Sequence, residues 1–123
     1  MSARQDAKRI LVVDDEPSVR ETIKMLLDLY GYQVHAVANG NEAIHCLENG
    51  GFDLLITDYS MSGINGDQLS LQIKQRWPHQ PVLLLTAYAG TRDDSSFANV
   101  DGVLGKPFMA EELKDAVAKL LAR

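Results

Sequence analysis

Three short runs of apolar residues constrain the fold most strongly, because each is too short for a helix and rich in branched side chains. The runs lie at residues 10–13, 54–57 and 82–85. All three are continuously apolar instead of alternating with polar residues, so both faces of each strand should be covered. This pattern is typical of a parallel sheet between two layers of helices. Weaker strands are predicted at 33–38 and 102–105.

Helical periodicity fills the intervals between these strands. Val19, Ile23, Leu26 and Tyr30 recur at helical spacing, and Gly31 after them marks the end of a helix. The same pattern predicts further helices at 41–49, 67–76 and about 110–121. At 92–99 we expect only a short helix, because aspartate, serine and asparagine compete with helix formation. Strands alternating with helices indicate a doubly wound α/β fold, with the 33–38 strand in an outer position.

Length and composition are those of one domain. The 123 residues suffice to bury a hydrophobic core without disulfides, and we expect an extension at 1–8 followed by a domain at 9–123. A net charge of -5 argues against a nucleic acid as direct partner, and no apolar run is long enough to cross a membrane. Because the N-terminus lacks a secretory signal and Cys46 is the single cysteine, we expect a cytoplasmic location.

Polar side chains stand at the ends of four predicted strands. In doubly wound folds, ligands bind outside the carboxyl ends of the strands. The residues at these ends are Asp14 and Asp15, then Asp58, Thr86 and Lys106. Because parallel strands end at the same edge of a sheet, we expect these side chains to gather in one site.

Three carboxylates at one edge would repel one another. Two unit charges about 4 Å apart cost about 4 kcal/mol at an effective dielectric constant of about 20. A divalent cation would offset this repulsion, and oxygen ligands without histidine or cysteine favour Mg²⁺ over zinc. Lys106 supplies a positive charge and Thr86 a hydroxyl donor, as an incoming phosphoryl group would require. With Asp58 as the nucleophile, the product would be an aspartyl phosphate.

Five short motifs occur in order, each at the end of a predicted strand or in a loop. They are Asp14-Asp15-Glu16, Asp58-Tyr59-Ser60-Met61, Asn65-Gly66, Thr86-Ala87-Tyr88 and Lys106-Pro107-Phe108. Together they resemble the receiver domain of bacterial response regulators, and the resemblance covers residues 9–121. It implies a CheY-like, flavodoxin-like fold: a five-stranded parallel sheet in the order 2-1-3-4-5 with helices on both faces.

The resemblance also implies roles for the acidic residues. Asp58 matches the phosphoacceptor. The direct Mg²⁺ ligands match Asp15, Asp58 and the backbone carbonyl of Ser60, while Asp14 matches an acid that acts through water. Mg²⁺ is therefore the cofactor that this family would require.

On the opposite side of the pocket, the resemblance assigns a switch. Thr86 matches a hydroxyl that moves to meet the phosphoryl oxygen, and Lys106 matches the cation that joins this oxygen to the acidic pocket. The bond between Lys106 and Pro107 matches one that is cis in the family, so a cis peptide is expected.

Three positions depart from, or add to, the family pattern. Ser62 replaces a usual proline, which should loosen the loop after Asp58. Val103 stands where an aromatic residue commonly swings between exposed and buried positions. In the Thr86-Ala87-Tyr88 motif, Tyr88 could substitute for that residue, or control the access of water to the acyl phosphate together with Ser60.

Such a domain would be a signalling module that catalyses its own phosphorylation and dephosphorylation, and not a turnover enzyme. A sensor histidine kinase or a histidine phosphotransfer protein would be the donor. The face formed by residues 92–99, 102–105 and 110–121 would read out the phosphorylation state and could form a homodimer.

Three alternatives remain. A phosphatase of the haloacid-dehalogenase kind also uses an aspartyl nucleophile, but it needs a second acid two residues later, where this chain has Ser60. A pseudo-receiver would only bind proteins, which the complete acidic set disfavours. A flavodoxin-like cofactor carrier would need a phosphate-binding loop after the first strand, where residues 14–16 are acidic and residue 17 is proline.

Overall fold

A parallel sheet runs through the centre of the molecule, in a computed structural model that describes residues 7–87 and 97–122. Its five strands are parallel and lie in the order β2-β1-β3-β4-β5, which confirms the expected order. In chain order the elements are β1 (Arg9–Val13), α1 (Pro17–Leu29), β2 (Gln33–Val37), α2 (Gly40–Asn49), β3 (Leu54–Asp58), α3 (Gly66–Arg76), β4 (Val82–Thr86), β5 (Gly102–Gly105) and α4 (Ala110–Leu121).

Strands β3 and β4 extend one residue beyond the apolar runs at 54–57 and 82–85. Asp58 and Thr86 are the last residues of β3 and β4, which confirms the strand ends expected from the sequence. Strand pairing continues to these polar residues because it depends on the backbone: Asp58 pairs with Leu85, and Thr86 pairs with Gly105. The short helix predicted at 92–99 falls largely outside the described residues.

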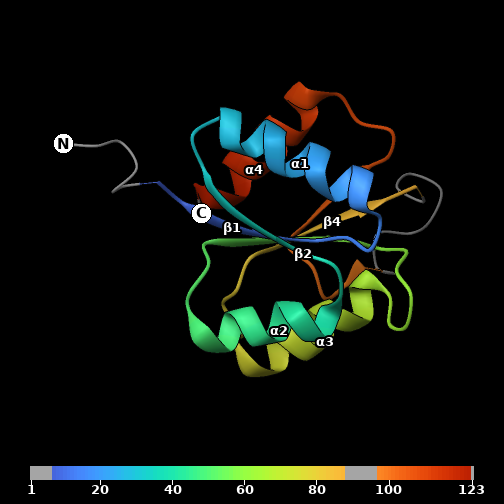
Figure 1. Ribbon diagram of the computed structural model, residues 1–123. Coiled ribbons are helices and arrows are strands. Elements are labelled where there is room, and N and C mark those ends of the chain that lie inside the picture. Colours follow the sequence, from blue (N-terminus) through green and yellow to red (C-terminus); the bar gives the residue numbers. More distant parts are fainter. Residues whose placement is uncertain (1–6, 88–96, 123) are drawn as a thin grey trace.

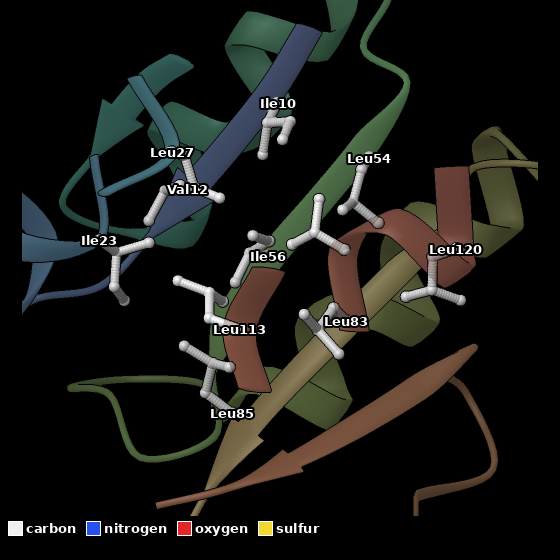
Figure 2. Packing of buried hydrophobic residues seen from close by; sticks show 11 residues of the cluster. Ile10, Val12, Ile23, Leu27, Leu54, Ile56, Leu83, Leu85, Leu113 and Leu120 are labelled. Atoms are coloured by element: carbon white, nitrogen blue, oxygen red, sulfur yellow. The ribbon is translucent and has the colours of Figure 1, made fainter. Parts of the chain in front are cut away.

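Helices cover both faces of the sheet, α1 and α4 on one face and α2 and α3 on the other (Figure 1). Alternate side chains of each strand therefore enter two separate cores: Ile10 and Val12 join the first, and Leu11 and Val13 join the second. Figure 2 shows the first core, where side chains of β1, β3 and β4 meet those of α1 and α4. Burial on both faces explains the continuous apolar runs.

None of the described helices is long and apolar enough to cross a bilayer.

Each fully buried leucine or isoleucine side chain of the two cores contributes about 1.5–3 kcal/mol through the hydrophobic effect. These cores hold the sheet, and so also its carboxyl edge, in one conformation.

Asparagine side chains set the starts of α2 and α3. Asn39 Oδ1 accepts a hydrogen bond from the Glu42 N–H at 2.9 Å. Asn65 Oδ1 accepts from the Gln68 N–H at 2.8 Å, and the Gln68 side chain accepts from the Asn65 N–H at 2.9 Å, which completes a capping box. The box starts α3 at Gly66, one residue earlier than predicted.

Gly66 allows α3 to approach the end of β3 closely. A Cβ atom at this position would collide with the backbone carbonyl of Asp58 and would lie 2.7 Å from Leu84 Cδ1. The Gly66 N–H also donates to the Tyr59 carbonyl at 2.8 Å. A residue without a side chain is therefore needed where the helix meets the backbone of Asp58.

We expect Gly66→Ala to lower the free energy of unfolding by about 1–3 kcal/mol, because the new methyl group overpacks against a backbone carbonyl that cannot move aside. Urea denaturation measures the effect. Gly51→Ala is the matched control, since a Cβ there meets no atom within 4 Å, and its stability should change by less than about 0.5 kcal/mol. Equal stabilities of the two variants would contradict the close approach.

Candidate functional site

The ends of β1, β3, β4 and β5 meet at the carboxyl edge of the sheet, as the strand order requires. Register aligns them: Asp58 pairs with Leu85, and Thr86 pairs with Gly105, the residue before Lys106. The Lys106 N–H continues the ladder by donating to the Thr86 carbonyl at 2.9 Å. Parallel pairing thus delivers an acid, a hydroxyl and an amine from distant parts of the chain to one place.

Asp58 and Lys106 form an ion pair at the centre of this edge. The Lys106 Nζ atom lies 2.6 Å from Asp58 Oδ1. Asp58 is only 6% exposed, so little water screens its charge, and the ammonium group partly replaces the lost hydration. The nucleophile expected from the sequence and its expected cation are therefore in direct contact.

Asp14 lies in the same pocket and is 2% exposed. Its Oδ1 atom accepts a hydrogen bond from the Glu16 N–H at 2.9 Å, whereas its buried Oδ2 atom has no hydrogen-bond partner among the described residues. Burial raises the pKa of Asp14; the charges of Asp58 and Asp15 raise it further, and the Glu16 hydrogen bond and Lys106 lower it. The pocket therefore holds more negative charge than its own cation balances.

Asp15 is exposed, and its carboxylate contacts the loop after β3. Its Oδ2 atom accepts a hydrogen bond from the Ser62 N–H at 2.8 Å. Within residues 7–87 and 97–122, no three His, Cys, Asp or Glu side chains are arranged to hold a metal ion. The structure thus brings Asp14, Asp58 and Lys106 together, and the Asp15 carboxylate, whose charge also acts on Asp14, is hydrogen-bonded to Ser62.

The donor set nevertheless fits Mg²⁺. All candidate ligands are oxygen atoms, namely the carboxylates of Asp14, Asp15 and Asp58 and the Ser60 carbonyl, and Mg²⁺ binds oxygen ligands of this kind. Two observations indicate that the negative charge of the pocket is not fully balanced. Asp14 Oδ2 has no hydrogen-bond partner among the described residues, and the pKa of this carboxyl group is raised. A cation here would relieve both.

The expected switch residues lie on β4 and β5 and in the segments that follow them. Thr86 is 1% exposed at the end of β4, and Ala87 is exposed. Val103 is half-buried in β5, where it pairs with Leu84. Tyr88 lies outside the described residues.

The peptide bond between Lys106 and Pro107 is cis. Lys106, Pro107 and Ala87 line a hollow of about 560 Å³ beside the first turns of α1. The ion pair at the carboxyl edge therefore lies next to a recess that a larger molecule could enter.

Two structural contacts at the site were missing from the sequence-based analysis. Arg20, in the first turns of α1, donates from Nη1 to the Asp14 carbonyl at 2.8 Å. Ser62 stood out as a replaced proline, but its N–H was not identified as the partner of Asp15. The sequence signal for the first contact is weak: a basic residue in the first turns of the helix that follows an acidic strand end. The second contact leaves no sequence signal, because its donor is a backbone N–H.

Comparison with known proteins gives consistent matches. The family model for the response regulator receiver domain matches residues 10–118. The chemotaxis protein CheY of Pseudomonas aeruginosa is 39% identical over 121 residues, covering 94% of this chain and 97% of that protein. The response regulator FleR of the same organism is 40% identical over 116 residues, covering 92% of this chain and 24% of FleR.

Solved structures agree. The response regulator TrrA of Thermotoga maritima, in complex with Mg²⁺-BeF, is 42% identical with a TM-score of 0.84, covering 92% of this chain and 98% of TrrA. TrrA in complex with the histidine kinase ThkA is 42% identical with a TM-score of 0.84, covering 93% and 98%. The chain belongs to the receiver domain family of two-component response regulators.

Proposed function

We propose that this domain accepts a phosphoryl group on Asp58 in a Mg²⁺-dependent reaction, with a sensor histidine kinase or a histidine phosphotransfer protein as donor. The observation that carries the proposal is the buried Asp58 carboxylate, 2.6 Å from the Lys106 ammonium group and in one pocket with Asp14. The solved TrrA structures, one with Mg²⁺-BeF and one with the kinase ThkA, support the same ligand and partner classes.

The residues of the pocket divide the chemistry between them. Because Lys106 contacts Asp58 Oδ1, the Oδ2 atom remains for attack on phosphorus. The new O–P bond replaces the donor's N–P bond, whose electron pair stays on the imidazole nitrogen, and Asp58 becomes an acyl phosphate. Lys106 and Thr86 would then contact the phosphoryl oxygens.

Mg²⁺, held by Asp14, Asp15, Asp58 and the Ser60 carbonyl, would supply the positive charge that offsets both the carboxylates and the phosphoryl group. Since Ser60 replaces the second acid that a haloacid-dehalogenase phosphatase needs, we infer that the domain does not turn over external phosphate esters. Water would instead hydrolyse the acyl phosphate and restore Asp58.

The recess beside Lys106 suits the approach of a protein donor. It is lined by Ser18, Val19, Thr22 and Phe108 besides Lys106, so an apolar wall with two hydroxyl groups leads to the ion pair.

We also propose that β5 and α4 belong to the face that reads out phosphorylation, and that this face could form a homodimer.

The phosphoacceptor is tested by intact mass after incubation with acetyl phosphate and Mg²⁺. The unsubstituted chain should gain one phosphoryl group, and Asp58→Asn should gain none, because the amide is not a nucleophile. Asp53→Asn is the matched control, since Asp53 precedes β3 at the opposite edge of the sheet and caps the Arg9 N–H. Phosphorylation of Asp58→Asn would refute the assignment.

We expect Lys106→Met to change two properties in opposite directions. Phosphoryl uptake should slow by about 100-fold, because the cation that stabilises the transferring group is lost. Mg²⁺ should bind more tightly, because Lys106 no longer competes for Asp58 Oδ1. Time-resolved mass measurement gives the phosphorylation rates, and calorimetric titration gives the Mg²⁺ affinities. Lys114→Met is the control, because Lys114 is exposed on α4. Slower phosphoryl uptake together with weaker Mg²⁺ binding would contradict these separate roles of Lys106.

Removing the Asp14 charge should stabilise the apoprotein while weakening metal binding. Asp14→Asn keeps an oxygen to accept from the Glu16 N–H, so the free energy of unfolding without Mg²⁺ should rise by about 1 kcal/mol. Mg²⁺ at 100 times the dissociation constant of the unsubstituted chain should stabilise that chain by about 2.7 kcal/mol and the variant by less. Urea denaturation with and without Mg²⁺ measures both, and identical Mg²⁺ effects would exclude Asp14 from the metal site.

A further inference from the structure

The carboxylate of Asp15 is held by a loop that is remote in sequence. Its Oδ2 atom accepts from the Ser62 N–H at 2.8 Å, across 47 positions of the chain. Ser62 lies in the β3–α3 loop (residues 59–65), whose base is closed by the bond from the Gly66 N–H to the Tyr59 carbonyl. The hydrogen bond therefore ties the end of β1 to an exposed position within this closed loop.

The backbone on both sides of Asp15 is fixed by other contacts. Before it, the Asp14 N–H donates to the Val37 carbonyl at 3.2 Å, and the Asp14 carbonyl accepts from Arg20. After it, the Glu16 N–H donates to Asp14 Oδ1. Because the main chain is held in this way, the Ser62 N–H is what orients the Asp15 carboxylate.

The Oδ2 atom of Asp15 is occupied by the Ser62 N–H. Among the residues that the structure describes, no group of three acids, histidines or cysteines is arranged to hold a cation. Asp14 and Asp58 are close enough for their charges to interact, and Asp15 is the acid whose carboxylate the loop holds. For Oδ2 of Asp15 to become a metal ligand, its hydrogen bond to the Ser62 N–H would have to break.

Proline, the residue usual at position 62 in the family, has no N–H and could not form this bond. In this chain the serine supplies one. We propose that the Ser62 N–H competes with Mg²⁺ for the Asp15 carboxylate, so that Mg²⁺ binding releases the β3–α3 loop. The inference rests on the proposed function, because it takes the metal site from there.

Thermodynamic linkage then couples the loop to the metal. The hydrogen bond between Asp15 and Ser62 lowers the affinity for Mg²⁺ by a certain factor. Bound Mg²⁺ weakens this hydrogen bond by the same factor. The loop also carries Ser60, whose carbonyl is a proposed ligand, so loop release and completion of the metal site are one event.

The decisive comparison uses two chains that differ in one backbone group. Ser62→Ala retains the N–H, and an ester analogue with lactic acid in place of that alanine has an oxygen instead. NMR titration of the remaining backbone amides gives both Mg²⁺ dissociation constants. We expect Ser62→Ala to match the unsubstituted chain, and the ester to bind Mg²⁺ roughly threefold to tenfold more tightly.

Two further measurements sharpen the outcome. Ser62→Pro should tighten Mg²⁺ binding in the same direction as the ester, and the Ser62 amide proton of the unsubstituted chain should exchange faster with Mg²⁺ than without it. Equal or weaker binding by the ester would overturn the competition alone, if the unsubstituted chain still binds Mg²⁺ and takes a phosphoryl group. No Mg²⁺ binding by any version would overturn the competition and the proposed function together.

Discussion

The crowding of carboxylates at one edge of a buried sheet is the constraint to which the rest of the structure responds. Asp14 and Asp58 are 2% and 6% exposed, so water screens their repulsion poorly. Lys106 balances one charge through its 2.6 Å contact with Asp58, while Asp14 Oδ2 keeps no hydrogen-bond partner among the described residues. An excess of negative charge held rigidly in this way lowers stability and at the same time prepares the pocket for a cation.

Rigidity and adjustability are divided between strands and loops. Asp58 and Thr86 belong to strands with both faces buried. Helix α3 packs against the backbone of Asp58 at Gly66, where there is no side chain. Asp15 and Ser62 of the β3–α3 loop are exposed, and a hydrogen bond joins them. The proposed nucleophile is therefore held by the cores, whereas Asp15, a proposed metal ligand, lies in a part of the site that depends on loop contacts.

Most of the fold could be predicted from the sequence, because strands covered on both faces need apolar side chains at every position. The clustering of Asp14, Asp58 and Lys106 followed from the rule that parallel strands end at one edge. The starts of α2 and α3 were predicted one residue late, since the apolar pattern does not report the hydrogen bonds of their asparagine caps. The role of Val103 in β5 stays a prediction, and so does that of Tyr88, which lies outside the described residues.

By itself the sequence determined the layers and the chemical groups of the pocket, because these follow from side-chain type and spacing, while the strand order was implied by the resemblance to receiver domains. Only the tertiary structure decided which oxygen each acid offers and what already occupies it. Asp15 is bound by the Ser62 N–H and the Asp14 carbonyl by Arg20, and both contacts use backbone groups that every residue except proline carries in full. Such groups leave no mark in a sequence, so their partners become known only when the chain has been folded around them.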